Sequence, residues 1–228
     1  MFCDKIRFTK NVIPIMKLPY DYIVVEGTIG AGKTSLANML CEQFNGSLIL
    51  EQFEENSFLP KFYQDPDKYA FPLELSFLAS RYQQLKDKLM PELFGQVKIA
   101  DYFIDKCVIF SRKTLQTDEF VLFRKLFSII IAQLPQPDLL VYLHKSPSHL
   151  KKNIISRGRD YEQNISLDYL EGIQDSYMQY IQHASLPRVI IIDTSEIDFV
   201  HSKSDYNSIV QIITREYPEG IHTINGSG

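Results

Sequence analysis

Residues 27 to 34 read Gly-Thr-Ile-Gly-Ala-Gly-Lys-Thr, which is a complete Gly-x-x-x-x-Gly-Lys-Thr phosphate-binding loop. The backbone N–H groups of such a loop point inward and hold phosphate oxygens at the start of a helix. Lys33 would reach the β- and γ-phosphates of a nucleotide, and the Thr34 hydroxyl would bind Mg²⁺. A glycine-rich turn with a chance lysine does not explain all of these residue types in this register. The residues expected to hold the nucleotide are Gly27, Thr28, Ile29, Gly30, Ala31, Gly32, Lys33, Thr34 and Ser35.

A carboxylate, Glu51, follows the apolar run Ser47-Leu48-Ile49-Leu50. At the end of a strand it would point into the crevice near the phosphate loop, where it could take a proton from an attacking hydroxyl. A solvated acid that begins a loop, in the company of Glu54 and Glu55, explains its position equally well.

A second acid, Asp101, lies within the apolar run Ile99-Ala100-Asp101-Tyr102-Phe103. An acid inside an apolar strand is costly unless it is paired. A nearby Mg²⁺, or a water bound to it, would offset that cost. The alternative is an acid at a strand end that caps a loop, and we favour the metal-related interpretation.

Two arginines flank a glycine in Arg157-Gly158-Arg159, between two predicted helices. Arginines on a mobile segment can fold over a nucleotide and stabilise charge on the transferred phosphoryl group. Taken alone, the segment is explained better as an ordinary charged connection. Together with a phosphate loop it predicts a basic lid at about residues 151–165, to which Lys151 and Lys152 add positive charge.

The loop after the last predicted strand runs from Asp193 to Phe199 and includes Asp198. Its position beside the phosphate loop suits the adenine of a nucleotide, although a plain strand-to-helix loop is as good an explanation. Most phenylalanines of the predicted helices and strands belong to the core. One or two could stack on a base, and Phe110 is our candidate.

Short runs that are apolar on both faces alternate along the chain with longer amphipathic segments. This pattern is typical of parallel strands covered by helices, and it predicts a P-loop NTPase-like, doubly wound α/β fold with a five-stranded parallel sheet. Ligands of such sheets bind beyond the C-terminal strand ends. The predicted strands are Tyr22–Val25, Leu48–Leu50, Lys98–Phe103, Leu139–Leu143 and Val189–Ile192. The predicted helices are Lys33–Phe44, Asp67–Met90, Glu119–Leu134, Pro147–Ser156, Leu167–His183 and Tyr206–Tyr217.

Length and composition fit one domain of a cytoplasmic protein. The 228 residues suggest an N-terminal extension (1–19), a single P-loop domain (20–217) and a C-terminal tail (218–228). A net charge of −4 gives no global basic field for nucleic acid or acidic membranes. No apolar run approaches the length of a membrane span. The three cysteines have no metal-like or paired spacing and fit reduced thiols.

Together these segments resemble the deoxyribonucleoside kinase family, and in particular its bacterial deoxyadenosine/deoxyguanosine branch. The resemblance spans about Tyr20 to Phe199 and includes the phosphate loop, Glu51-Gln52-Phe53-Glu54-Glu55-Asn56 and the arginine-rich lid. It implies transfer of the ATP γ-phosphate to the 5′-hydroxyl of a deoxynucleoside, with Mg²⁺ as cofactor. A homodimer formed through long helices such as Asp67–Met90 and Glu119–Leu134 is also implied.

The resemblance also assigns roles to individual residues. Glu51 falls on the carboxylate that activates the 5′-hydroxyl, while Tyr63 and Glu162 fall on residues that contact the 3′-hydroxyl. Arg81 matches an arginine near the base. Arg157 and Phe199 would flank the adenine of ATP, and Arg157 and Arg159 would stabilise the transferred phosphoryl group.

Two departures from the family pattern affect these expectations. The family commonly has an acid-Arg-Ser triplet where this chain has Asp101-Tyr102-Phe103, so a cation beside Glu51 is missing and Lys106 is our hypothesis for its substitute. Glu74 falls where the family usually has a base-reading glutamine. A carboxylate offers only acceptors, which suits the two donors on the edge of guanine. We therefore predict a purine substrate, with deoxyguanosine slightly ahead of deoxyadenosine.

Three other functions are alternatives to a deoxynucleoside kinase. A nucleoside monophosphate kinase such as thymidylate kinase needs arginines for its acceptor phosphate, and Glu51 and Glu162 would repel that phosphate. A GTP-dependent switch would carry an Asn-Lys-x-Asp motif, which this sequence lacks. A non-catalytic nucleotide-binding regulator would phosphorylate none of the deoxynucleosides.

Overall fold

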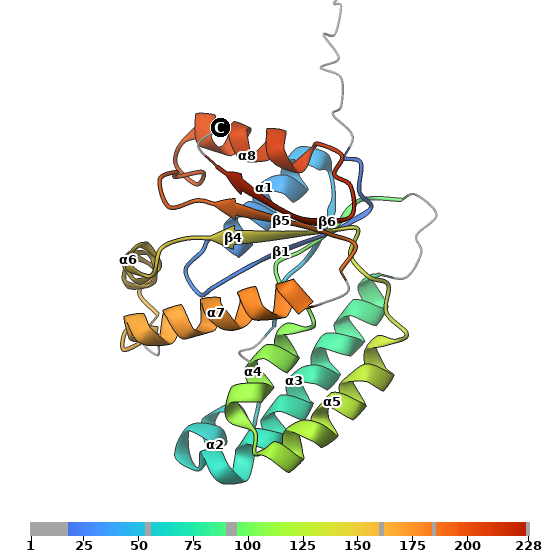
Figure 1. Ribbon diagram of the computed structural model, residues 1–228, viewed down its shortest axis with the longest axis vertical. Coiled ribbons are helices and arrows are strands. Elements are labelled where there is room, and N and C mark those ends of the chain that lie inside the picture. Colours follow the sequence, from blue (N-terminus) through green and yellow to red (C-terminus); the bar gives the residue numbers. More distant parts are fainter. Residues whose placement is uncertain (1–17, 53–55, 90–94, 160–161, 184–185, 227–228) are drawn as a thin grey trace, which may run out of the picture.

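A six-stranded parallel sheet, in the order β2-β3-β1-β4-β5-β6, forms the centre of the protein (Figure 1). The computed structural model describes residues 18–52, 56–89, 95–159, 162–183 and 186–226. All strand pairs are parallel, so every C-terminal strand end lies at the same edge. The strands are β1 (Tyr22–Gly27), β2 (Ser47–Ile49), β3 (Lys98–Ala100), β4 (Leu139–His144), β5 (Arg188–Asp193) and β6 (Gly220–Asn225).

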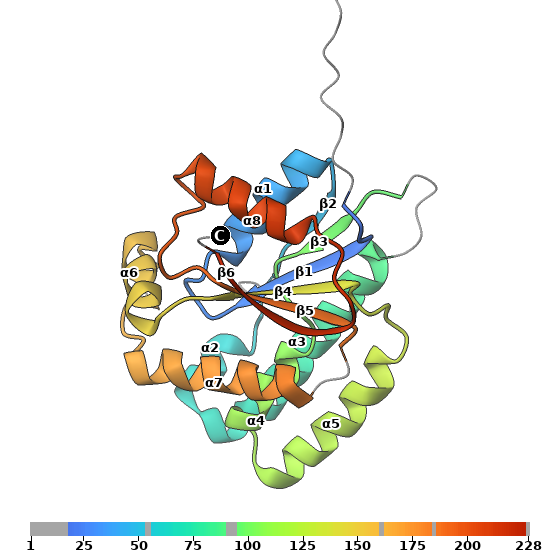
Figure 2. The same cartoon turned by 45° about the horizontal axis from the view of Figure 1, so that its top comes forward.

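Helices cover both faces of the sheet. Figures 1 and 2 show α1 and α8 on one face and α3, α4, α5 and α7 on the other. The helices are α1 (Lys33–Phe44), α2 (Leu59–Gln64), α3 (Pro66–Lys88), α4 (Lys106–Thr114), α5 (Thr117–Ile131), α6 (Pro147–Arg157), α7 (Leu167–His183) and α8 (Lys203–Ile213).

The two layers arise from alternation along strands that are buried on both faces. In β1, Ile23 and Val25 pack into the core on the α1 and α8 side. Tyr22 and Val24 pack into the second core, which includes residues of α3, α4, α5 and α7. Because successive side chains of a strand point to opposite faces, one apolar run supplies both cores and fixes the strand end that carries the phosphate loop.

The predicted doubly wound α/β class and all five predicted strands are confirmed, with small differences at their ends. β3 ends at Ala100, so Asp101 follows the strand rather than lying inside it. The sheet has a sixth strand, β6, which falls in the 218–228 segment that we expected to be a tail. Leu18, within the expected 1–19 extension, is buried in the core. Helices α2 and α4 were not anticipated.

Some sequence-based expectations lie outside the described residues. They concern positions 1–17, 53–55, 90–94, 160–161, 184–185 and 227–228, which include parts of the extension, the lid and the tail. Within the described part of the chain, no helix is long and apolar enough to cross a membrane.

Candidate active site

The phosphate loop connects β1 to α1 and has the backbone that its glycines permit. Gly30 and Gly32 have φ angles of 86° and 92°, in the left-handed region that favours glycine. A Cβ on Gly30 would lie 2.7 Å from the Leu150 carbonyl oxygen of α6. A Cβ on Gly32 would lie 2.8 Å from Cζ of Phe199. The loop is therefore held closely between α6 and the segment that follows β5.

Lys33 folds back over this loop. Its Nζ donates to the carbonyl oxygens of Gly27 at 2.7 Å and Thr28 at 3.3 Å, and it lies 3.9 Å from the Glu26 carboxylate. Burial lowers the pKa of Lys33, and the charge of Glu26 opposes that effect. The ammonium group is thus already at the phosphate loop, bonded to main-chain groups of the loop itself.

Glu26 is a buried acid at the end of β1, exposed by only 1%. One carboxylate oxygen accepts from the Gly27 N–H at 3.0 Å, and the other accepts from the Phe103 N–H at 2.9 Å. It therefore joins the phosphate loop to the segment after β3. No sequence motif assigns a role to Glu26, because its second hydrogen bond goes to a segment 77 residues away.

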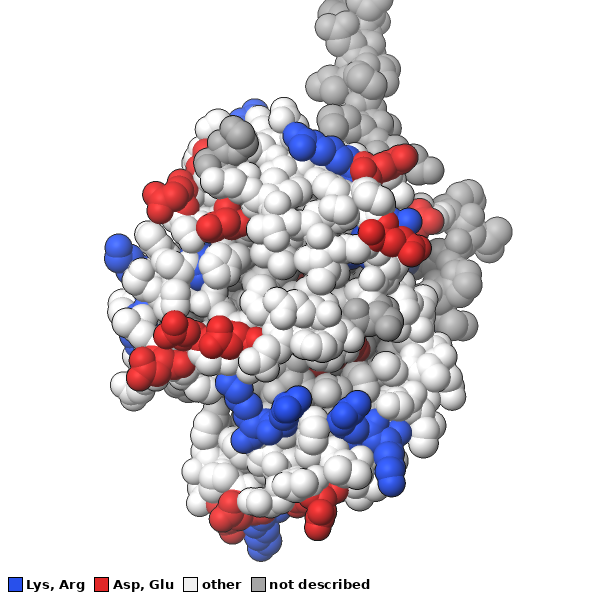
Figure 3. All heavy atoms as spheres, in the orientation of Figure 1, with Lys and Arg blue, Asp and Glu red and all other residues white. Residues whose placement is uncertain are grey.

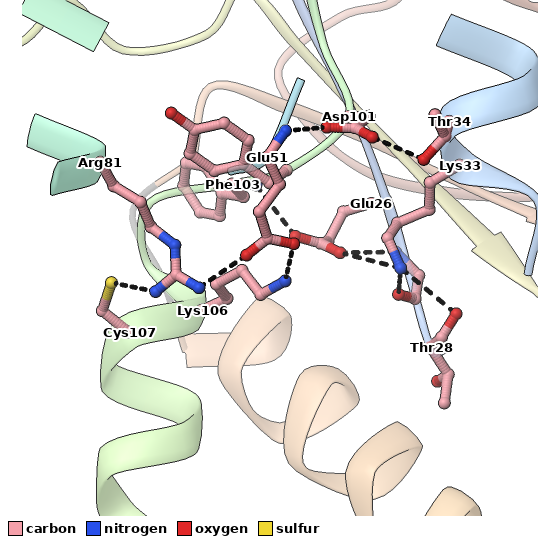
Figure 4. A network of polar contacts seen from close by, with 12 residues as sticks. Glu26, Thr28, Lys33, Thr34, Glu51, Arg81, Asp101, Phe103, Lys106 and Cys107 are labelled. Carbon is pink, nitrogen blue, oxygen red and sulfur yellow. Dashed lines mark hydrogen bonds and ion pairs between the residues drawn. The ribbon is translucent and has the colours of Figure 1, made fainter. Parts of the chain in front are cut away.

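Asp101 links the phosphate loop to the segment that carries Glu51 (Figure 4). One carboxylate oxygen accepts from the Thr34 hydroxyl at 2.6 Å, and the other accepts from the Glu51 N–H at 2.7 Å. The cost of its burial is offset by these two hydrogen bonds. The structure thus brings together the two residues that the sequence predicted to bind Mg²⁺, Thr34 and Asp101.

Glu51 is held by two cations. Arg81 of α3 donates to one carboxylate oxygen at 2.6 Å, and Lys106 of α4 donates to the other at 2.7 Å. Burial alone would raise the pKa of Glu51, but Lys106 and Arg81 outweigh it and hold that pKa well below its usual range. Arg81 also donates to the Cys107 sulfur at 2.9 Å. Lys106 therefore lies where we expected a substitute for the missing arginine.

Glu74 is a buried residue of α3, with an exposed fraction of 5%. One of its oxygens accepts from the Thr114 hydroxyl of α4 at 2.8 Å. Burial raises the pKa of Glu74, against the opposing effects of the Thr114 hydrogen bond and the Arg81 charge. Pro72 lies within α3, and Glu74 and Arg81, which follow it on this helix, are both buried.

Aromatic side chains lie near Lys106 and Glu74. Phe110 is half-buried, with the Lys106 Nζ 5.7 Å from its ring centroid. Tyr63 of α2 is 69% exposed. Tyr169 of α7, which we did not anticipate, has its pKa raised by burial and then by its neighbours Tyr63 and Glu74. No sequence motif marks Tyr169, because its position near Tyr63 and Glu74 depends on how α7 packs.

The arginines of the lid pair with an acid from the same segment. Arg157 forms an ion pair with one oxygen of Glu162, and Arg159 lies 3.4 Å from the other. Lys151 donates to the carbonyl oxygens of Gln163 at 2.6 Å and Ile165 at 2.8 Å, which ties the segment to α6. The structure thus brings Arg157, Arg159 and Glu162 together.

The two residues expected beside adenine differ in exposure. Phe199 is 3% exposed, with its ring against Gly32 and the core. Asp198 has an exposed side chain that accepts from the Val200 and His201 N–H groups. The structure thus assigns Phe199 to packing under the phosphate loop, and its contact with adenine stays a prediction.

Another buried acid, Asp105, lies outside this network. It is 6% exposed and accepts from the Tyr180 hydroxyl, while its Oδ1 has no hydrogen-bond partner among the described residues. Burial raises the pKa of Asp105 to about 6, although the Tyr180 hydrogen bond opposes this. The ionised carboxylate therefore costs stability above pH 6, and that cost disappears as the pH falls from about 6 to 4.

We expect Asp105→Asn to raise the free energy of unfolding at pH 8 by about 1–2 kcal/mol, because the buried charge is removed while the Tyr180 bond is kept. The gain should shrink towards pH 4. Urea denaturation of both proteins at pH 4, 6 and 8 measures it. Tyr180→Phe is the matched comparison, since it should destabilise most at pH 8. A difference between wild type and Asp105→Asn that is constant with pH would contradict the argument.

The chain is similar in sequence to proteins of known activity along most of its length. Residues 23–217 match the model of a family described as deoxynucleoside kinase. The deoxyguanosine kinase of Bacillus subtilis (strain 168) is 38% identical over 193 residues, which are 82% of this chain and 93% of that protein. The deoxyadenosine kinase of Dictyostelium discoideum is 33% identical over 203 residues, 86% of this chain and 79% of that protein.

A solved structure shares the fold. The deoxyadenosine kinase from M. mycoides with bound dATP superposes with a TM-score of 0.71 at 22% identity, covering 85% of this chain and 100% of that one. At this identity the likeness concerns the fold, which is the doubly wound sheet described above.

Proposed function

Since this chain belongs to the deoxynucleoside kinase family, we propose that it transfers the γ-phosphoryl group of ATP to the 5′-hydroxyl of a purine deoxynucleoside. One observation carries this proposal beyond family membership. The Glu51 carboxylate is kept ionised by two cations, and the Glu51 N–H is joined through the Asp101 carboxylate to Thr34 of the phosphate loop. An ionised base beside a phosphate loop suits an acceptor that is an uncharged hydroxyl.

Catalysis would rest on positioning and on positive charge around the phosphoryl oxygens. Glu51 orients the 5′-hydroxyl and accepts its proton. Arg81 and Lys106 hold the pKa of Glu51 well below its usual range, so the carboxylate is ionised and can accept a hydrogen bond from the 5′-hydroxyl. Lys33 contacts the β- and γ-phosphates, and Arg157 and Arg159 of the lid neutralise charge that develops on the transferred group.

Magnesium is part of the proposal, and the residues present fit it. Thr34 and Asp101 provide a hydroxyl and a carboxylate oxygen 2.6 Å apart at the edge of the phosphate loop. Mg²⁺ in kinase sites takes one or two protein oxygens together with phosphates and waters. Among the residues that the structure describes, no group of three or more His, Cys, Asp or Glu could hold a metal. The ion would therefore arrive with ATP and would offset charge on its phosphates.

The sugar would be held at its 3′-hydroxyl by Tyr63 and Glu162. The Glu162 carboxylate is paired with Arg157 and Arg159. To bind the 3′-hydroxyl, it would have to release one of these arginines. The same carboxylates disfavour a monophosphate acceptor, since Glu51 and Glu162 would repel its phosphate. Arg81 and Phe110 would contact the base, with Glu74 accepting hydrogen bonds from its edge.

The assay that tests this proposal presents the purified protein with ATP, Mg²⁺ and each of the four natural deoxynucleosides. We expect phosphorylation of deoxyguanosine and deoxyadenosine, with deoxyguanosine slightly preferred. Because burial raises the pKa of Glu74, preference for deoxyguanosine should grow as rising pH ionises that carboxylate. Turnover of thymidine above the purines would overturn the assignment, and turnover of none would leave a nucleotide-binding regulator.

Replacement of Glu74 separates base reading from the rest of the site. A glutamine offers a donor and an acceptor where a carboxylate offers only acceptors. Glu74→Gln is therefore expected to lower the ratio of kcat/KM for deoxyguanosine over deoxyadenosine by about tenfold. Asp87→Asn, at an exposed acid of the same helix, should leave that ratio unchanged.

We also propose that the protein forms a homodimer through α5. Val121, Leu122 and Ile129 of this helix are 50%, 49% and 68% exposed, which is unusual for large apolar side chains on one helix. Sedimentation velocity that gave a monomer at micromolar concentration would contradict the dimer.

Nucleic acid and membrane are not expected as partners, because the net charge of −4 gives no global basic field. On the face shown in Figure 3, acidic side chains over α7 lie beside basic ones over α4 and α5. The free, buried thiols of Cys41 and Cys107 support a cytoplasmic location.

A further inference from the structure

A buried lysine outside the catalytic network lies directly after β4. Lys145 is 8% exposed, and its Nζ donates to the Thr194 carbonyl oxygen at 2.7 Å and to the Ile197 carbonyl oxygen at 3.4 Å. Both acceptors belong to residues 194–199, which we call the 194–199 loop. A buried lysine is uncommon unless it is paired, and here its donors go to the main chain of one loop.

The 194–199 loop lies against the phosphate loop. Phe199, two residues after Ile197, lies with its ring against Gly32, where an added Cβ would come within 2.8 Å of it. Ile197 and Phe199 share a core with Ala31 of the phosphate loop. A change in the path of the 194–199 loop would therefore be transmitted to the backbone that holds the nucleotide.

Lys145 is one of several contacts that fix this loop from the β4 side. The Thr194 N–H and hydroxyl both donate to the His144 carbonyl oxygen, at 2.8 and 2.9 Å. Gln174 of α7 donates to the Lys145 carbonyl oxygen at 2.8 Å, which fixes the lysine in turn. Burial lowers the pKa of Lys145, and the carboxylates of Asp198, Asp193 and Glu196 oppose this. A charged donor makes stronger hydrogen bonds than a neutral one.

We propose that Lys145 is a positioning residue for the phosphoryl donor: it holds the 194–199 loop at the distance from the phosphate loop that ATP binding requires. The inference rests on the proposed function, because it assigns this side of the phosphate loop to the nucleoside half of ATP. Lys145 acts through main-chain carbonyl groups of the loop and does not touch the acceptor site around Glu51. Its removal should therefore affect the two substrates unequally.

The test replaces Lys145 with methionine, which keeps the length of the side chain and removes its donors. We expect the KM for ATP to rise about tenfold, while the KM for deoxyguanosine and kcat change less than twofold. Lys145→Gln, which keeps one donor, should give an intermediate KM for ATP and remains informative if the methionine variant folds poorly. Lys203→Met, at an exposed lysine of α8, is the matched control and should behave as wild type.

Hydrogen exchange supplies a readout that does not depend on turnover. The Thr194 and Ile197 amides, which are bonded within this region, should exchange faster in Lys145→Met, while the β1 amides keep their protection. An unchanged KM for ATP in an active enzyme would overturn the role of Lys145, and so would equal rises in both KM values. A wild-type protein that phosphorylates no deoxynucleoside would instead overturn the proposed function, and ATP titration by calorimetry then decides whether Lys145 still controls nucleotide affinity.

Discussion

Replacing Glu51 with glutamine should lower kcat/KM for the deoxynucleoside by about a thousandfold, with little change in ATP affinity. The amide keeps the size of the side chain but cannot accept the proton of the 5′-hydroxyl. It also leaves Arg81 and Lys106, at 2.6 and 2.7 Å from the carboxylate, without their common counter-ion. Two buried cations without an anion repel each other, so the loss combines missing chemistry with a displaced acceptor site.

Steady-state kinetics with deoxyguanosine and a separate measurement of ATP affinity check this expectation. Asp87→Asn, an exposed acid on α3, is the control for loss of a negative charge. Because the pKa of Glu51 is held well below its usual range, the wild-type rate should show no loss between pH 8 and 5 from protonation of this residue. A variant that kept a tenth or more of wild-type turnover would remove Glu51 from the chemistry.

Local patterns in the sequence were sufficient for the phosphate loop and for the buried strands. The loop needs only neighbouring residues, and parallel strands are marked by runs that are apolar on both faces. β6 gave a weaker signal, because it is an edge strand in which half-buried and exposed residues alternate and three of its residues are His222, Thr223 and Asn225. The short helix α4 was hidden because the apolar residues before it, Tyr102 and Phe103, extended the predicted third strand.

Contacts between distant segments were harder to predict. Arg81 was expected near the base from its family position, and that role stays a prediction, but no local pattern indicated that its guanidinium would also contact the carboxylate of Glu51, 30 residues away. Glu26 reaches the Phe103 N–H across 77 residues. Such pairs follow from the order of the strands, since β1 lies beside β3 and β3 beside β2. Lys106 could be named in advance only because a missing arginine required some other cation.

Lys106→Met is the second large effect, and we expect it to lower kcat/KM for the deoxynucleoside by about a hundredfold. Burial would lower the pKa of Lys106, but Glu51 and then Glu26 raise it, so the side chain stays charged. Its removal leaves Arg81 as the single cation on Glu51. The pKa of Glu51 should then rise, and the acid limb of the pH–rate profile should move to higher pH.

That shift in the pH profile distinguishes an electrostatic role from a structural one. A lysine that merely filled space would lower the rate equally at all pH values when replaced by methionine. Lys106→Arg keeps the charge and should recover most of the activity, because the family commonly supplies an arginine to this site. Lys88→Met, at an exposed lysine near the end of α3, is the control. If Lys106→Met turned over as fast as wild type, the cation beside the attacking hydroxyl would have to be Arg81 alone.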